Sequence, residues 1–397
     1  MPSVGAARAN FLYCLLALAL ALFGLYAGFV AAAAEHADYR VYEAAVAAQR
    51  AGENPYLAAS IERHGGGTNL SHVYPPLMTA VLVPLVAIGF PGAVAVYLLG
   101  LAFATVWLGR EFAPRTLPWW LGLAAFATTG FAVARWNLQT GNLGLLELLV
   151  FAVACVAVHR RQVALFALLV GWLGFCKILP LSLGVLLVPL VQRREAPVHA
   201  LLWPLLAFAA LHGLSYALFP VESASWVQML TGGAEGQHTP LHERTSGNNN
   251  PTFGLLLLDL WQLEVGSGLA KVVCAVLFAA GGWVVLRAVT RTWRAARVVE
   301  ALPLLVVATL LCWPRLKPYG YGYAWVAVVV GAATGGARRA LLLLGLCGVV
   351  PALLPWSPNL PLEALQLVKR NHLAVLLLGA GLVLAWERSP RERDASD

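Results

Sequence analysis

Charged residues are scarce in this chain. They make up 12% of its 397 residues, whereas hydrophobic residues make up 60%. Soluble domains carry about 25% charged residues, and no polar stretch here is longer than about 40 residues, so no soluble domain can be separated from the rest. Apolar runs of about 20 residues recur along the chain, as in membrane-spanning helices and unlike the alternating strands of a barrel. The sequence therefore predicts an all-α integral membrane protein.

The sequence also lacks the short motifs of several enzyme classes. It has no GxxxxGKS or GxxxxGKT phosphate loop, no GxSxG turn and no GxGxxG that follows a strand. Its six cysteines lie in or at the ends of apolar runs, and none forms a CxxC pair. No two histidines on the expected outer face show tight metal-ligand spacing. We therefore predict neither disulfides nor a metal site.

The arginines behind the net charge of +8 lie mostly in short clusters between the apolar runs. Such clusters are typical of cytoplasmic loops, so they indicate membrane topology and not nucleic-acid binding. Residues 77–90 decide that topology, because a helix of this length covers only about 21 Å of a roughly 30 Å hydrocarbon core. If this segment is an interfacial or re-entrant helix on the outer face, every later arginine cluster falls in the cytoplasm.

This topology gives about twelve transmembrane helices with both termini in the cytoplasm. We expect a single transmembrane domain over residues 1–397, with large extracytoplasmic loops at 34–90 and 219–266. The expected location is the cell membrane, meaning the inner or plasma membrane of a bacterium. The pattern shows no obvious inverted repeat, which argues against a transporter.

The polar stretch 35–76 carries the first candidate for chemistry. Asp38 follows the first apolar run directly, near the expected membrane surface. A carboxylate in that position can act as a general base that takes a proton from a sugar hydroxyl. A helix-capping or solvated aspartate is the alternative interpretation.

Three cations on the expected outer face form the second candidate. Lys177 stands alone at the tip of an apolar hairpin, and a cation at membrane depth costs about 2.5–3.5 kcal/mol on insertion scales. Arg315 and Lys317 lie between two prolines, on the side where topology requires no positive charge. We predict that these residues bind a lipid phosphate. Snorkelling of Lys177 to lipid headgroups is the alternative.

Amide side chains form the third candidate. Gln139 and Asn142 flank a glycine between two spans, and Asn248 and Asn250 belong to an asparagine run before Pro251. Amides can read sugar hydroxyls, although they are also ordinary turn residues.

An ordered set of motifs resembles glycosyltransferase family 87 over about residues 10–330. Gln139-Thr140-Gly141-Asn142 resembles the family's Gly-Gln-x-Asn turn, shifted in detail, and residues 176–180 resemble its Lys-x-x-Pro hairpin. The set is Asp38-Tyr39 with Tyr42 and Ala45, Gly52-Glu53-Asn54-Pro55-Tyr56, Tyr74-Pro75-Pro76, Gln139-Thr140-Gly141-Asn142, Cys176-Lys177-Ile178-Leu179-Pro180 and Asn248 to Gly254. One departure stands out. The family often has a late turn that contains histidine, and here residues 313–321 contain none.

The resemblance implies a GT-C fold and a polyprenyl-phosphate sugar as donor, usually of mannose, used on the extracytoplasmic side. It places the family's catalytic base at Asp38, and Arg315 or Lys317 stands where the late histidine is missing. It implies no cofactor other than the lipid-linked donor. The expected contacts to sugar or acceptor are Tyr39, Tyr42, Asn54, Tyr56, Tyr74, Gln139, Asn142, Asn248 and Asn250.

The resulting hypothesis is an inverting glycosyltransferase. Its expected partners are the bilayer, the polyprenyl-phosphate sugar and a lipid or glycan acceptor, with no nucleic acid. Two alternatives remain open at this point: a multi-pass lipid or solute transporter, and a non-catalytic membrane protein of envelope assembly.

Overall fold

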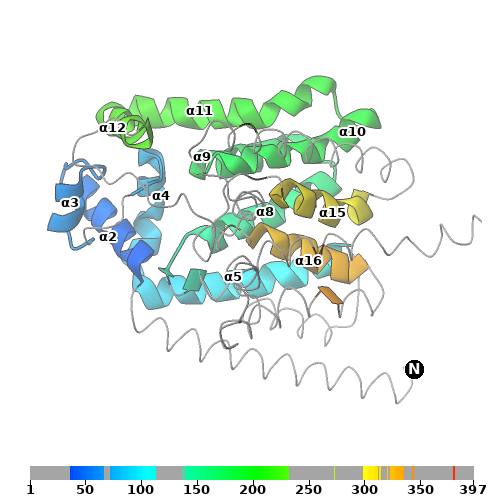
Figure 1. Ribbon diagram of the computed structural model, residues 1–397, viewed down its shortest axis with the longest axis horizontal. Helices are drawn as coiled ribbons and strands as arrows, with labels where there is room; N and C mark the ends of the chain where they lie inside the picture. Colours follow the sequence, from blue (N-terminus) through cyan, green and yellow to red (C-terminus); the bar gives the residue numbers. More distant parts are fainter. Residues whose placement is uncertain are drawn as a thin grey trace, which may run out of the picture. The chain divides into compact units, whose positions relative to one another are not determined.

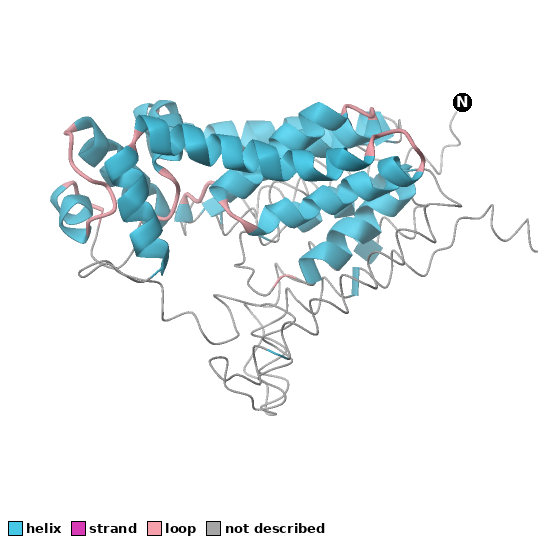
Figure 2. Cartoon of the chain, turned by 90° about the horizontal axis from the view of Figure 1, so that it is seen from above, coloured by secondary structure: helices cyan, strands magenta, loops and turns pink. Residues whose placement is uncertain are grey.

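A computed structural model describes residues 36–66, 72–112, 137–138, 140–231, 298–311 and 322–334, with isolated positions at 272, 313, 320, 342–343 and 379–380. Every regular element in these ranges is a helix (Figures 1 and 2), which confirms the all-α prediction for this part of the chain. The chain divides into two compact units. One comprises residues 26–100 and 136–242, and the other comprises the remaining residues.

The polar stretch after residue 35 folds into two short helices, α2 (Ala37–Arg50) and α3 (Ala58–Arg63). The buried face of α2 carries tyrosines and small residues that pack against α3 and α4. Each helix ends at a glycine with positive φ, Gly52 and Gly65, which lets the chain reverse without a Cβ clash. The segment predicted to be an outer loop is therefore largely helical, because its alanines and tyrosines supply an apolar face.

Helix α4 (Pro76–Ala87) begins directly after Pro75 and is 12 residues long. It covers about 18 Å, which is shorter than a roughly 30 Å hydrocarbon core, and its place on the outer face stays a prediction. Gly89, with φ of 71°, separates it from α5 (Gly89–Phe112), whose 24 residues cover about 36 Å.

The helices that follow residue 143 form the body of the same unit. Helix α8 (Gly144–His159) and helix α9 (Val163–Cys176) make a tight hairpin, and α9 also packs along α11 (Trp203–Leu218), as Figure 1 shows. The close approach of α9 to α11 depends on Gly171, where a Cβ would lie 2.5 Å from the Cβ of Ala207. The elements between α9 and α11 are η1 (Leu179–Leu187), α10 (Val188–Gln192) and η2 (Val198–Leu202).

Two helices in the described part are long and apolar enough to cross a membrane. They are α5 and the continuous stretch Val198–Leu218 formed by η2 and α11. Leu206 and Leu214 on α11 are 62% and 48% exposed, and such outward-facing apolar side chains are typical of a surface covered by lipid. Several of the about twelve predicted spans lie wholly or partly outside the described residues, so that count stays a prediction.

Two segments differ from the sequence-based expectation. Residues 179–192, expected as one α-helix, begin as the 3-10 helix η1, in a stretch where Pro180 and Pro189 each remove a backbone donor. The expected loop 219–266 opens with helix α12 (Pro220–Thr231), which begins at a proline and packs against α11 and α4. Residues 232–266 of that loop lie outside the described ranges.

The other unit contributes one described helix pair. Helix α15 (Val298–Leu311) and helix α16 (Gly322–Thr334) pack against each other, within two residues of the bounds expected from the sequence. Trp313 lies edge-on to Tyr323 between them, with ring centroids 5.6 Å apart.

Two helix ends near the arginine clusters carry backbone strain. Helices α8 and α10 both end in a Schellman turn, and the left-handed position is taken by an arginine, Arg161 with φ of 62° and Arg194 with φ of 59°. A side chain in this conformation costs roughly 1–2 kcal/mol, which glycine avoids. The strained arginines keep positive charge at these helix ends, which the sequence predicts to lie in the cytoplasm.

We therefore expect Arg194→Gly to raise the free energy of unfolding by about 0.5–1 kcal/mol, because the strain is relieved and part of the gain is lost to the freer unfolded chain. Reversible chemical unfolding in detergent micelles measures this change. Arg194→Ala is the matched control, since it removes the charge but keeps the Cβ. A glycine variant no more stable than the alanine variant contradicts the interpretation.

Candidate active site

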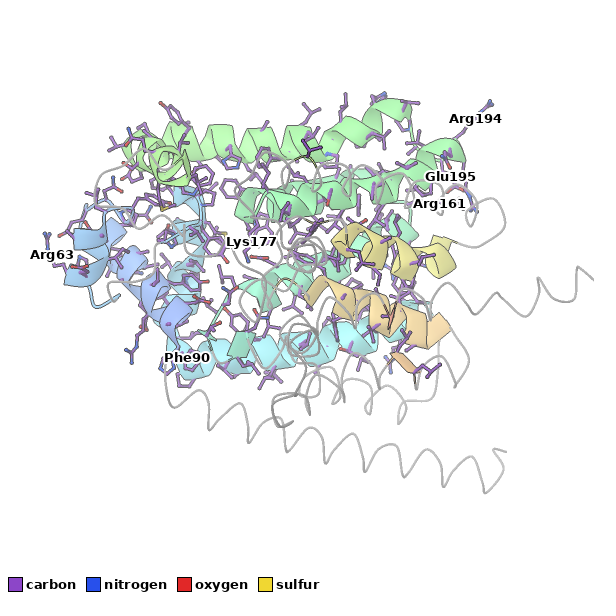
Figure 3. All side chains as sticks on the ribbon, in the orientation of Figure 1. Arg63, Phe90, Arg161, Lys177, Arg194 and Glu195 are labelled. Atoms are coloured by element: carbon purple, nitrogen blue, oxygen red, sulfur yellow. The ribbon has the colours of Figure 1, made fainter. Side chains whose placement is uncertain are left out.

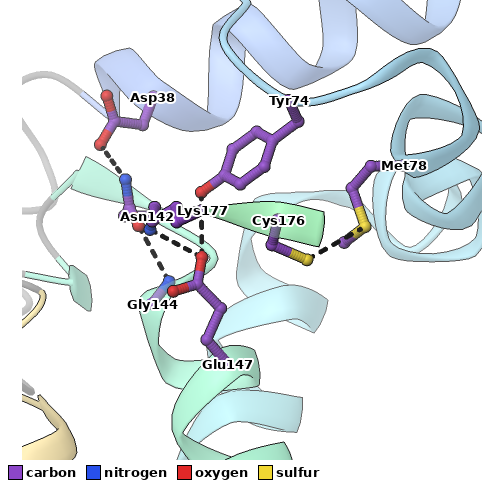
Figure 4. Close-up of polar contacts among 8 residues, drawn as sticks. All are labelled: Asp38, Tyr74, Met78, Asn142, Gly144, Glu147, Cys176 and Lys177. Carbon is purple, nitrogen blue, oxygen red and sulfur yellow. Dashed lines mark hydrogen bonds and ion pairs between the residues drawn. The ribbon is translucent and has the colours of Figure 1, made fainter. Parts of the chain in front are cut away.

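Asp38 lies in the first turn of α2, where the positive end of the helix dipole favours a carboxylate. Its side chain is partly exposed, and its Oδ2 accepts a hydrogen bond from Asn142 Nδ2 at 2.9 Å (Figure 4). Asp38 and Asn142 are more than 100 residues apart in the sequence. The contact therefore brings together the first polar stretch and the turn before α8, two segments that the sequence singled out separately.

The orientation of Asn142 is fixed by its own backbone surroundings. Its Oδ1 accepts the N–H of Gly144 at 2.9 Å, so its NH2 group must face Asp38. The close contact of this turn with α2 requires a glycine at position 141. Gly141 has φ of 70°, and a Cβ there would lie 2.5 Å from the Cβ of Tyr39. Asn142 is 4% exposed. Its buried amide is thus satisfied on both sides and holds the carboxylate of Asp38 in place.

A second carboxylate, that of Glu147, lies in the first turn of α8, three residues after Gly144. The residue is 2% exposed, and its Oε1 accepts hydrogen bonds from Lys177 Nζ at 2.6 Å and from the hydroxyl of Tyr74 at 3.4 Å (Figure 4). The ammonium also lies 5.5 Å from the centre of the Tyr74 ring, within the range of a cation–π contact. The ion pair thus supplies a counter-charge to a buried carboxylate, and burying that carboxylate without one would cost several kcal/mol.

Helix geometry explains why these charges meet. Glu147 lies in the first turn of α8 and Lys177 forms the C-cap of α9, and in an antiparallel hairpin these two ends are adjacent. Each charge also complements the dipole of its helix end. Figure 3 places Lys177 well away from Arg161, at the turn between α8 and α9, and from Arg194 and Glu195, which follow α10.

Glu147 is not among the site residues predicted from the sequence. A signal was present, because an isolated acid in one apolar helix and an isolated lysine at the end of the next helix form a natural pair. The sequence could not show that the two helices run side by side with those ends together.

The tyrosines expected to contact sugar or acceptor make contacts within the protein. Tyr39 donates its hydroxyl to the carbonyl of Leu85 at 3.1 Å, and Tyr56 donates to the carbonyl of Tyr74 at 2.6 Å. Tyr42 packs edge-on against the Tyr74 ring, with centroids 5.8 Å apart. All three side chains are buried, and Tyr42 and Tyr56 hold Tyr74 in position against the ion pair. A direct contact of any of them with sugar stays a prediction.

The remaining predicted residues fall into two groups. Asn54 donates from Nδ2 to Ser225 Oγ at 2.7 Å, which ties the turn before α3 to α12. The others, Gln139, Asn248, Asn250, Arg315 and Lys317, lie outside the described residues. Among the residues that are described, no three His, Cys, Asp or Glu side chains lie close enough together to hold a metal ion.

Comparison with protein families decides the class of the chain. The model of glycosyltransferase family 87 matches residues 72–314, which is more than half of the sequence. The chain belongs to glycosyltransferase family 87. Family 87 membership indicates a glycosyltransferase and, with the apolar helices, a membrane protein. It therefore favours an enzyme over a transporter or a non-catalytic partner. Comparison with curated proteins gives no match.

The extent of the family 87 match bears on the site. Tyr74, Asn142, Glu147 and Lys177 all lie within the matched residues, whereas Asp38 precedes them. The match is also shorter at both ends than the expected resemblance over residues 10–330. The role of Asp38 therefore rests on its position beside Asn142 and not on the family match.

His72, beside the site, gives the protein a pH-dependent stability. The ring lies among Tyr42, Tyr56 and Tyr74, and its Nε2 is 2.8 Å from Thr79 Oγ1. Complete burial lowers the pKa of His72 to about 3, from 6.5 for an exposed histidine. Between these values only the unfolded chain takes up the proton, so this group makes the folded state less stable as the pH falls.

We expect His72→Gln to flatten the acid side of the stability curve. Wild type should lose up to about 1.4 kcal/mol per pH unit more than the variant as the pH falls through the range 6 to 4. Unfolding in detergent at several pH values measures the difference. Thr79→Val, which removes the hydrogen bond but keeps the buried imidazole, should retain the wild-type slope. Equal slopes for wild type and His72→Gln contradict the prediction.

Proposed function

We propose that this chain is an inverting glycosyltransferase with the GT-C fold. It transfers a sugar, of which mannose is the first candidate, from a polyprenyl-phosphate donor to a lipid or glycan acceptor on the extracytoplasmic face. The observation that carries the proposal is the convergence of the Asp38–Asn142 and Glu147–Lys177 pairs at one end of the helices α8 and α9. Together they supply a basic group for the acceptor and a cation for the phosphate.

The acceptor side of the reaction uses Asp38. Asn142 occupies Oδ2, which leaves Oδ1 as the oxygen that takes the proton from the acceptor hydroxyl. The hydroxyl oxygen then forms a bond to the anomeric carbon as the bond from that carbon to the donor phosphate oxygen breaks. The sugar changes configuration because attack and departure occur on opposite faces.

The donor side uses Lys177. The polyprenyl phosphate that leaves gains negative charge as its bond to the sugar breaks, and an ammonium at hydrogen-bond distance stabilises that charge. The Lys177 side chain is 25% exposed, whereas that of Glu147 is 2% exposed, so the lysine is the member of the pair proposed to meet a ligand. Arg315 and Lys317 are proposed to complete the phosphate site. No metal ion is required for a phosphate leaving group of this kind.

The proposed orientation follows from the ends of the helices. Arg160 and Arg161 lie at one end of the α8–α9 hairpin, and the site lies at the other. Positive charge favours the cytoplasm, so the site faces the opposite side. The site is proposed to lie in the outer part of the membrane, within reach of a lipid phosphate. The short helix α4 is proposed to flank a lateral opening for the lipid tail.

The test of the catalytic base is Asp38→Asn. We expect transfer to fall by at least about 100-fold, because the amide keeps the shape of the side chain but cannot take the proton. The assay is transfer from a radiolabelled polyprenyl-phosphate sugar in isolated membranes.

Glu43→Gln is the matched control, since Glu43 is an exposed acid on the same helix and should be dispensable. Equal transfer by wild type and Asp38→Asn would remove Asp38 as the base. Absence of transfer by wild type from every polyprenyl-phosphate sugar would overturn the donor class.

A further inference from the structure

The Glu147–Lys177 pair is built asymmetrically. The Glu147 side chain is 2% exposed and the Lys177 side chain is 25% exposed, and 2.6 Å separates Oε1 from Nζ. Glu147 belongs to a helix, α8, whereas Lys177 has extended backbone just past the end of α9. The rigid, buried member of the pair is therefore the acid, and the adjustable member is the lysine.

A lysine without an anchor would not serve as a phosphate ligand of fixed geometry. Its four-carbon side chain has many rotamers, and its ammonium has no preferred direction for its three N–H donors. Glu147 fixes one donor from the buried side. Tyr74 encloses the ammonium further, because its hydroxyl bonds the same Oε1 and its ring lies 5.5 Å from Nζ.

The pair is also expected to survive the arrival of a ligand. If Lys177 left Glu147 to follow a phosphate, a carboxylate that is 2% exposed would be left without its counter-charge, and that state is strongly unfavourable. The lysine therefore keeps its bond to Glu147 and meets an anion with its exposed side. The substrate therefore binds beside the ion pair and does not displace Glu147 from Lys177.

We propose that Glu147 is a positioning residue for the donor, which acts through Lys177 by fixing its ammonium toward the lipid phosphate. The inference rests on the proposed function, in which Lys177 contacts that phosphate, and it assigns a role to an acid that itself does not touch the substrate. A merely structural Glu147 would stabilise the helix pair without any effect on the donor.

The experiment compares Glu147→Gln, Glu147→Asp, Lys177→Met and the double variant Glu147→Gln/Lys177→Met in two assays. One measures kcat and the KM values for donor and acceptor. The other measures the binding of farnesyl phosphate, a short polyprenyl monophosphate, from the shift it causes in the melting temperature. This second assay needs no turnover.

We expect Glu147→Gln to lower kcat/KM for the donor by about 10-fold or more, with the KM for the acceptor unchanged, because the charge-assisted bond to Lys177 is lost. Glu147→Asp keeps the charge and should recover part of the loss. In the Lys177→Met background, Glu147→Gln should cause no further loss of activity and should raise the melting temperature, since it removes a buried unpaired carboxylate.

Glu195→Gln is the matched control. Glu195 pairs with Arg161 at 3.3 Å at the far end of the same helices, so its loss should leave both donor parameters and farnesyl phosphate binding unchanged. If Glu147→Gln alters neither the donor KM nor kcat while wild type is active, the positioning role is wrong and the proposed function stands. Independent losses for Glu147→Gln and Lys177→Met would also overturn it.

The binding assay separates the two proposals. If wild type transfers no sugar but binds farnesyl phosphate, and Glu147→Gln weakens that binding, the proposed function fails and the positioning of Lys177 stands. If wild type neither transfers sugar nor binds farnesyl phosphate, both are overturned.

Discussion

The site depends on a buried negative charge that must be neutralised. Glu147 lies in an apolar helix with almost no exposure, and Lys177 and Tyr74 both donate to its carboxylate and offset the cost of burying it. This requirement holds the first turn of α8 against the end of α9. It also holds Tyr74, and through Tyr74 the helices α2 and α4, at the same end of the unit. The charge pair thus fixes the place where the polar groups of several distant segments meet.

The second constraint is the turn from residue 137 to residue 144. Asn142 can reach Asp38 only because Gly141 adopts a positive φ and leaves room for Tyr39. Gly144 then fixes the amide by donating its own N–H. The result is a carboxylate with one oxygen held by an amide, at the same end of the helices as a lysine that is paired with a buried acid and whose side chain is 25% exposed. That combination suits a reaction in which a hydroxyl loses a proton while a phosphate leaves.

The body of the unit keeps this chemistry at one end and positive charge at the other. Helix α9 runs antiparallel to α8 and brings the chain back to the end that carries Glu147. The tight turns after α8 and after α10 each place an arginine in a backbone conformation that favours glycine. Arginines that are kept at these positions despite the strain are consistent with a fixed orientation of the protein in the membrane. The hairpin lies within residues 72–314 of the chain, which match glycosyltransferase family 87.

For the part of the chain that the structure describes, the amino-acid pattern predicted the all-α class and the approximate bounds of the apolar helices, because scarce charge and long apolar runs leave few alternatives to membrane helices. It also identified Asp38, Asn142 and Lys177, because isolated polar residues stand out in an apolar chain. It did not reveal that α2, α3 and α12 are helices, since their polarity resembles that of loops. Only the tertiary structure showed that Glu147 pairs with Lys177 and that Asn142 holds Asp38. Those contacts join residues 30 and 104 positions apart, and their geometry depends on how helices pack, which no local pattern encodes.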